Sequence, residues 1–247
     1  MVTNSGIRWV QPLLTGLIMQ ITNDKSPDGR AFDLGWHSDR PLSVFLETAL
    51  VAPRRGAVRK LLRRARMSQA QRTADIASAP DRLVMREHIF PEVARRAGNI
   101  LFVGVRAYTC EYPAQFEEHG GVCWTLDKDP HASVYGVEGR HETGCVTKIG
   151  ELFPDTVFRT IVLTGVLGFG VNRFSDQLRS LAACAGALEL DGTLILGWND
   201  RRVHSSLLEE AACRWFDFRN FAHLPPRIWV TGYDHNFAFL RRRGSGM

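Results

Sequence analysis

A glycine and an aspartate form the clearest chemical pattern in the sequence. Gly104 lies in the apolar run 100–105, where a residue without a Cβ lets the backbone turn sharply against a ligand. Asp127 follows the next apolar run, 122–126, and comes 23 residues after Gly104. A carboxylate about 20 residues beyond a glycine turn is suited to accept hydrogen bonds from the ribose hydroxyls of a nucleoside. The spacing therefore predicts a nucleoside-binding site.

The residues after Gly104 narrow the choice of nucleoside. In a dinucleotide-binding G-x-G-x-x-G loop, glycines would stand at the positions of Arg106 and Tyr108, whose side chains would crowd a pyrophosphate. The chain also lacks the phosphate-loop pattern G-x-x-x-x-G-K-[ST]. A nucleoside without phosphates, such as S-adenosylmethionine, tolerates this turn. A nicotinamide cofactor is disfavoured, and a nicotinamide oxidoreductase stays open as an alternative.

The elements expected around these residues form an α/β fold. From residue 99 on, short apolar runs alternate with segments long enough for helices, which indicates a parallel sheet covered on both faces. The segment 224–234 contains two prolines and a glycine and fits no helix, so the strands that flank it are expected to be an antiparallel pair at the sheet edge. The expected strands are 100–105, 122–126, a weak one near 144–147, 160–164, 193–198, 215–221 and 236–240.

The first 98 residues are expected to be helical and irregular, with helices over 42–51 and 82–97. They hold 16 Lys and Arg against 9 Asp and Glu, a balance of +7 in a chain whose net charge is +5. The excess is concentrated in residues 54–72, which contain no acid and whose apolar residues recur at helical spacing. We interpret this basic run as a solvated helix face. The alternative is a surface for phosphate, nucleic acid or anionic lipid.

Composition excludes several classes of protein. The chain has 247 residues, 45% of them hydrophobic and 23% charged, which is typical of a globular protein that needs no metal or disulfide to fold. No run reaches the roughly 18 apolar residues that a membrane helix requires. The five cysteines are widely spaced without a C-x-x-C pair, which favours a reduced, cytoplasmic compartment. No cluster of His, Cys and acids has metal-ligand spacing, so no metal is expected.

Four segments resemble class I S-adenosylmethionine-dependent methyltransferases, in the family's order over residues 99–241. They are FVGVRAYT at 102–109, LDKDP at 126–130, TGVLGFG at 164–170 and LGWND at 196–200. They are most similar to a bacterial branch with an FVGxRxYT first loop and an LGWND fifth strand. The chain departs from the common pattern at Phe102, where an acid is usual, and in keeping one glycine of the usual three.

The resemblance implies a fold and a division of the chain. The fold is a Rossmann-like, seven-stranded, mostly parallel sheet with helices on both faces and an antiparallel last hairpin. Residues 1–98 would be an N-terminal helical lid or substrate region, and residues 99–247 the S-adenosylmethionine-binding core.

The resemblance also implies roles for residues at the strand ends. The methionine end of the cofactor would be lined by Gly104, Val105, Arg106 and Tyr108. Asp127 would hold the ribose, and the adenine would be flanked by Lys128, Cys145, Val146 and Thr147. The sulfonium and the substrate would be faced by Thr164 and Gly165. Contacts with the acceptor would come from Trp198, Asn199 and Arg201.

Methyl transfer asks little of the protein beyond geometry, because a sulfonium methyl is already a good electrophile and alignment supplies most of the acceleration. A nitrogen or hydroxyl acceptor can also need a base. Asp200 and His235 are the candidates. The structural alternatives are that Asp200 caps a following helix, 201–214, and that His235 is a buried, hydrogen-bonded histidine.

The sequence therefore predicts an enzyme that methylates a small metabolite or natural-product intermediate on an N, O or S atom. A second hypothesis is an RNA- or nucleotide-directed methyltransferase that binds phosphates through the basic run 54–72, and it predicts a strong salt dependence of binding. A third is a binding protein that keeps the nucleoside fold without activity. The acceptor atom and the oligomeric state stay open.

Overall fold

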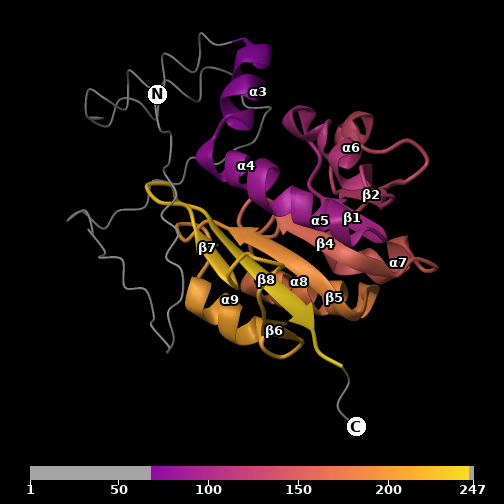
Figure 1. Ribbon diagram of the computed structural model, residues 1–247, viewed down its shortest axis with the longest axis vertical. Coiled ribbons are helices and arrows are strands. Elements are labelled where there is room, and N and C mark those ends of the chain that lie inside the picture. Colours follow the sequence, from indigo (N-terminus) through magenta and orange to yellow (C-terminus); the bar gives the residue numbers. More distant parts are fainter. Residues whose placement is uncertain (1–67, 245–247) are drawn as a thin grey trace. The chain divides into compact units, whose positions relative to one another are not determined.

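The computed structural model of the protein describes residues 68–244 (Figure 1). The predicted helix 42–51 and residues 54–67 of the predicted basic run lie outside the described residues. The division of the chain at residue 98 therefore stays a prediction.

Within residues 68–244 the centre is a sheet of eight strands, in the order β3-β2-β1-β4-β5-β8-β6, with β7 paired to β8. The first five strands in this order are parallel to one another, whereas β8 runs antiparallel to β5, β6 and β7. This confirms the predicted Rossmann-like α/β fold with an antiparallel last hairpin. The strands are β1 (Asn99–Val103), β2 (Val122–Asp127), β3 (His141–Thr143), β4 (Phe158–Thr164), β5 (Leu188–Trp198), β6 (Phe216–Phe218), β7 (Arg227–Trp229) and β8 (Asn236–Arg242).

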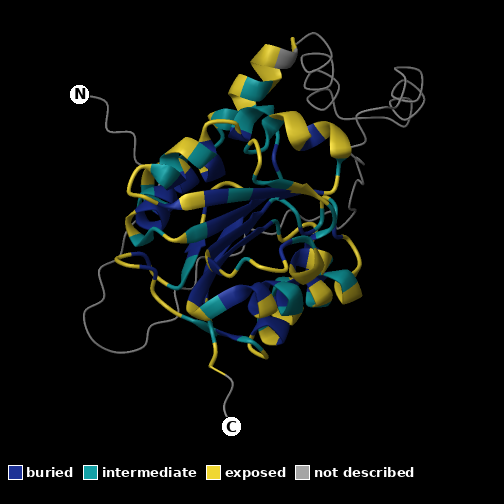
Figure 2. Ribbon diagram, turned by 90° about the vertical axis from the view of Figure 1, so that its right-hand side faces the viewer, coloured by how far each residue is buried: buried dark blue, intermediate teal, exposed yellow. Residues whose placement is uncertain are grey.

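The central strands are buried on both faces, as their continuous apolar sequences predict. On β1, Leu101 and Val103 belong to the core cluster that also contains residues of α7, α8 and α9. Phe102 points to the opposite face and packs on an aromatic residue of α6. Figure 2 shows buried residues concentrated along these strands and exposed residues on the outer surfaces of the helices.

The helices follow the predicted alternation with strands, and none of those in residues 68–244 is long and apolar enough to span a bilayer. The predicted helix 201–214 is shorter than expected, at Ser205–Ala212. The α-helices are α3 (Gln69–Ala77), α4 (Pro80–Val84), α5 (Phe90–Arg96), α6 (Tyr112–Glu117), α7 (Ile149–Leu152), α8 (Phe174–Ala187) and α9 (Ser205–Ala212).

The predicted helix 82–97 is present, but a π-helical turn, η1 (Met85–Ile89), joins α4 to α5. Pro91 lies in the first turn of α5 and has no N–H to donate to the carbonyl one turn earlier, which favours a local change of winding here. The helix ends where Ala97 and Gly98 both take positive φ angles, of 49° and 78°.

Two details of the sheet differ from the prediction. The weak strand expected near 144–147 lies at 141–143 instead, and the 3-10 helix η4 (Val146–Lys148) occupies part of the expected range. The strand β3 has the polar sequence His-Glu-Thr, so an analysis based on apolar runs could not locate it. The other difference is β7, which is three residues long and lies inside the segment 224–234 that was expected to connect two strands.

Four aromatic rings attach α5 and α6 to β1. The Phe90 ring meets Tyr112 and Phe116 edge-on, at centroid distances of 4.8 and 4.7 Å. Phe102 of β1 meets Tyr112 edge-on at 5.5 Å. All four side chains are at most 2% exposed. These contacts hold the helical segment that follows residue 80 against the sheet.

We expect Phe102→Ala to lower the free energy of unfolding by about 3–5 kcal/mol, because it removes a buried ring and leaves a cavity among three others. Urea unfolding followed by circular dichroism measures this. Val134→Ala, at a side chain that is 76% exposed, is the control and should change the value by less than about 0.5 kcal/mol. Equal effects of the two substitutions would contradict this account of the core.

Candidate functional site

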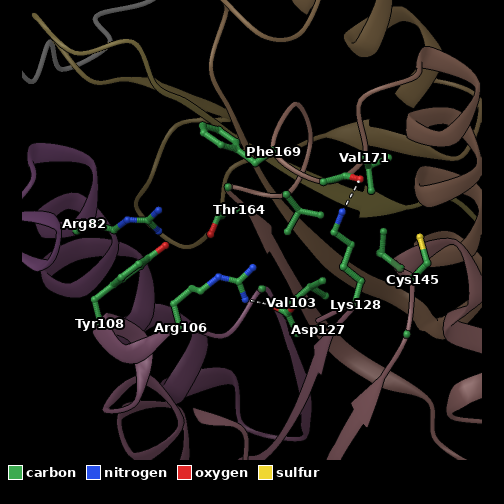
Figure 3. A pocket seen from close by; sticks show the side chains of 16 residues that line it. Arg82, Val103, Arg106, Tyr108, Asp127, Lys128, Cys145, Thr164, Phe169 and Val171 are labelled. Carbon is green, nitrogen blue, oxygen red and sulfur yellow. Dashed lines mark hydrogen bonds and ion pairs between the residues drawn. The ribbon is translucent and has the colours of Figure 1, made fainter. Parts of the chain in front are cut away.

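A pocket lies at the carboxyl ends of β1, β2 and β4 (Figure 3). The strand order reverses at β1, since β2 and β3 lie on one side of it and β4 and β5 on the other. Ligands of open α/β sheets bind in the crevice at such a point. Nine of the residues predicted to bind the cofactor line this pocket: Gly104, Arg106, Tyr108, Asp127, Lys128, Cys145, Val146, Thr164 and Gly165.

Two further residues of that prediction, Val105 and Thr147, do not line the pocket. Val105 is buried behind the first loop, and its carbonyl oxygen accepts a 2.6 Å hydrogen bond from Arg106. Thr147 lies in η4. Both residues are next in the chain to lining residues, Arg106 and Val146.

Gly104 makes the turn at the end of β1. Its φ of +95° is strained for residues with a side chain, and its N–H donates to the carbonyl of Leu126 at 2.8 Å. A Cβ added to Gly104 would lie 3.2 Å from a methyl group of Val166. The glycine therefore brings the backbone close to the ends of both neighbouring strands.

The carboxylate of Asp127 is nearly buried and held on both oxygens. Oδ2 accepts a 2.6 Å ion-paired hydrogen bond from Arg106 Nη1, and Oδ1 accepts the backbone N–H of Asp129 at 2.9 Å. Figure 3 shows the Arg106 side chain extended along the pocket toward Asp127. Because each carboxylate oxygen has two lone pairs, each can accept one more hydrogen bond from a ligand.

The loop after β4 forms another wall of the pocket. The carbonyl of Val166 accepts the N–H groups of Phe169, Gly170 and Val171 within 3.1 Å, which winds the loop tightly. Lys128 Nζ donates to the carbonyl of Gly170 at 3.3 Å. Thr164 and Gly165 were predicted to face the ligand, but no role was predicted for Phe169 and Gly170, which also line the pocket.

Arg82 was also missed, because nothing in the sequence connects an arginine in α4 with the strand ends. Its side chain is 11% exposed, and its guanidinium carbon lies 5.2 Å from the centroid of the Tyr108 ring. A Cβ added to Gly165 would be 3.3 Å from Arg82 Nη2. In Figure 3 the side chains of Arg82, Tyr108 and Thr164 converge on the same end of the pocket.

The residues predicted to contact the acceptor, Trp198, Asn199 and Arg201, do not line this pocket. Trp198 is buried in the core, the carbonyl of Asn199 accepts backbone N–H groups, and Arg201 is exposed with its Nε 3.7 Å from Asp234. Their predicted contact with an acceptor stays a prediction.

Asp200, a predicted base, is a structural junction outside the pocket lining. Its Oδ1 accepts hydrogen bonds from Trp198 Nε1 at 3.2 Å, from Asn236 Nδ2 at 2.7 Å and from the Ser205 hydroxyl. The expectation that Asp200 caps the following helix is wrong, because that helix begins at Ser205 with His204 in the N-cap position. Asp200 instead joins the ends of β5 and α9 to the start of β8.

We expect Asp200→Ala to lower the free energy of unfolding by about 1–3 kcal/mol, because the amide of buried Asn236 would lose its acceptor. Trp198 Nε1 would keep only the Ser205 hydroxyl, at 2.8 Å. Urea unfolding measures the loss, with Asp155→Ala at an exposed aspartate as the control. An unchanged unfolding midpoint for Asp200→Ala would contradict the proposal that Asp200 stabilises the fold by joining β5, α9 and β8.

His235, the other predicted base, is 3% exposed and also lies outside the lining. Its Nδ1 is 3.7 Å from Asp81 Oδ2, and its ring is 4.6 Å from that of Phe237. Burial, together with the charge of Arg82, lowers the pKa of His235 to about 3. The ring is therefore neutral at physiological pH.

This shift makes stability depend on pH. In the unfolded chain His235 is protonated below its ordinary pKa of about 6.5, whereas in the folded chain it is protonated only below a pKa of about 3. Acidification from pH 7 to 5 should therefore cost about 2 kcal/mol of stability at this site. Urea unfolding at both pH values should show a smaller loss for His235→Gln. Equal losses in both proteins would disprove the shift.

Among residues 68–244, no group of three or more His, Cys, Asp and Glu side chains is arranged to hold a metal ion. All five cysteines are free thiols: Cys110, Cys123, Cys145, Cys184 and Cys213.

Neither a family model nor a curated protein matches the chain. Solved structures do. A TehB-like SAM-dependent methyltransferase from Corynebacterium glutamicum is 21% identical, with 70% of this chain and 98% of that chain covered and a TM-score of 0.49. The N-methyltransferase NodS from Bradyrhizobium japonicum is 13% identical, with coverages of 68% and 99% and a TM-score of 0.49. TrmN from Thermus thermophilus is 13% identical, with coverages of 63% and 48% and a TM-score of 0.48.

Proposed function

We propose that the pocket at the ends of β1, β2 and β4 binds S-adenosylmethionine and that the protein transfers its methyl group to a small-molecule acceptor. The observation that carries the proposal is the buried carboxylate of Asp127 beside the positive-φ turn at Gly104, at the point where the strand order reverses. A carboxylate at the end of the second strand is the group that holds a ribose in nucleoside-binding sheets.

The donor set fits such a ligand. Asp127 keeps lone pairs for the ribose hydroxyls, and charge-assisted hydrogen bonds of this kind are strong. The apolar side chains of Val103, Val146 and Phe169 line the same pocket and suit the faces of an adenine ring. Arg82 supplies a positive charge at the far end, which suits the carboxylate of the methionine part.

The first loop argues against a dinucleotide. The first element after Gly104 is a three-residue 3-10 turn, η2 (Ala107–Thr109), and the α-helix α6 begins only at Tyr112, whereas a pyrophosphate site uses the N-terminus of a helix directly after the glycine turn. Arg106 and Tyr108 both project into the pocket where glycines would be needed. These features favour a nucleoside without phosphates.

In the proposed reaction the bound cofactor supplies an electrophilic methyl group on a sulfonium. The task of the chain is then to align it in line with the acceptor's lone pair and to exclude water. Asp127 would fix the sugar, and the tight backbone at Gly104 and Gly165 would let the ligand approach the strand ends closely. Thr164 lies on the side of the pocket that faces Arg82 and Tyr108, which is the end proposed for methyl transfer.

Calorimetric titration with S-adenosylhomocysteine tests the proposal. We expect binding to the wild type and a loss of about 10- to 100-fold in affinity for Asp127→Ala, because charged hydrogen bonds to the ribose would be removed. Asp155→Ala, at an exposed aspartate that precedes β4 and does not line the pocket, is the matched control and should bind like the wild type.

NADH is titrated in parallel. Tight binding of NADH with no binding of S-adenosylhomocysteine would overturn the proposal in favour of a nicotinamide enzyme. Circular dichroism of Asp127→Ala confirms that any loss of affinity is not a loss of fold.

A further inference from the structure

Three buried polar side chains at the Arg82 end of the pocket have atoms without a hydrogen-bond partner in the described part of the chain. These atoms are Asp81 Oδ1, Thr164 Oγ1 and His235 Nε2. Each residue is at most 4% exposed. An unsatisfied buried polar atom costs about 1–3 kcal/mol, so three of them from α4, β4 and the residue before β8 indicate a place where a polar ligand supplies the missing hydrogen bonds.

Two of these side chains already form a pair. Asp81, in α4, presents Oδ2 at 3.7 Å from Nδ1 of His235, which precedes β8. This distance is longer than a hydrogen bond, and such contacts often tighten when a ligand completes the site. With Nδ1 facing a carboxylate, the proton of the neutral ring belongs on Nδ1, and the lone pair belongs on Nε2.

The other ring nitrogen, Nε2, lies near the side chain of Thr164, beside Gly197 of β5. A Cβ added to Gly197 would lie 2.9 Å from His235 Nε2 and 2.8 Å from Thr164 Cγ2. The absence of that Cβ in β5 lets His235 Nε2 and the side chain of Thr164 share one space. Because Thr164 also lines the pocket, Nε2 is next to the end proposed for methyl transfer.

We propose, on the basis of the methyltransferase function above, that Asp81 and His235 orient a nitrogen acceptor. Asp81 is a positioning residue that holds the ring as the Nδ1–H tautomer. His235 Nε2 then accepts a hydrogen bond from an N–H of the acceptor. The acceptor is therefore an uncharged amine, whose own lone pair stays free to attack the methyl group.

The chemistry of a desolvated imidazole favours nitrogen over oxygen. Burial keeps His235 neutral and makes it a weak base, so it suits hydrogen bonding better than removal of a hydroxyl proton. In the transfer, a bond forms between the amine nitrogen and the methyl carbon while the carbon–sulfur bond breaks and its electron pair goes to sulfur. The positive charge moves from sulfur to nitrogen, and the surplus N–H proton is lost to water after the product leaves.

The charged groups around the ring come from two segments, α4 and the loop that follows β5. Arg82 disfavours the imidazolium, Asp200 favours it, and Asp81 faces Nδ1. The carboxyl of Asp81 has a raised pKa because it is buried, and the adjacent Arg82 opposes that rise. The result is a neutral His235 ring beside the carboxyl group of Asp81.

The test uses NMR of the full chain with ¹⁵N-labelled histidines, which number eight. We expect His235 to be the Nδ1–H tautomer from pH 5 to 8 and to lose this preference in Asp81→Asn, whereas Asp155→Asn keeps it. The signals are assigned by their absence in His235→Gln or, if that variant does not fold, by the contact of the ring with Phe237. An Nε2–H tautomer in the wild type would refute the role of Asp81 in orienting the His235 ring.

A second arm probes the lone pair in the complex with S-adenosylhomocysteine. Methoxyamine, an amine that is uncharged at neutral pH, should shift the Nε2 signal of His235, and ethanol should shift it less. A larger shift with ethanol would refute the proposal that the acceptor atom is a nitrogen. The absence of a shift with methoxyamine would show that an acceptor does not reach Nε2 of His235. Failure of S-adenosylhomocysteine to bind would refute the proposed function itself, which the tautomer measurement alone does not address.

Discussion

The strand β1 is hydrogen-bonded on both edges and buried on both faces, and this constraint determines where the site lies. Its neighbours β2 and β4 are parallel to it, so all three strands end at the same edge of the sheet. Gly104, Asp127 and Thr164, which are far apart in the sequence, are thereby brought to one pocket. The core beneath the strands supplies the stability that lets these ends carry polar and strained residues.

Desolvation determines the charge states in this region. The ion pair of Arg106 with Asp127 neutralises a nearly buried carboxylate, and it does so at 2.6 Å without consuming the acceptor capacity of the carboxylate. At the other end of the pocket, burial suppresses the protonation of His235, and Arg82 adds to that effect. This region therefore combines a carboxylate that is ion-paired with Arg106 and a neutral imidazole whose Nε2 has no hydrogen-bond partner.

The architecture could be predicted because it depends on local patterns. The continuous apolar runs of β1 and β4 and the glycine-to-acid spacing mark buried strands and their exits, and they identified Gly104 and Asp127. The other seven predicted residues that line the pocket came from the resemblance to methyltransferases. The polar strand β3 and the three-residue β7 escaped prediction because their pairing is decided by neighbours rather than by their own hydrophobicity. Arg82 and Asp81 escaped for the same reason, since only tertiary packing brings α4 to the strand ends.

The π-helical turn at Met85–Ile89 sets the rotational phase between α4 and α5. A regular α-helix turns about 100° per residue. A π-helical turn holds one extra residue, so it rotates the side chains of α4 by about 100° about the helix axis relative to those of α5. The ring of Phe90 in α5 packs on Tyr112 of α6, which in turn meets Phe102 of β1. The helix α4 carries Asp81 and Arg82. Removing a single residue from this turn would restore ordinary winding, leave the apolar face of α5 in register, and swing both polar side chains away from the pocket.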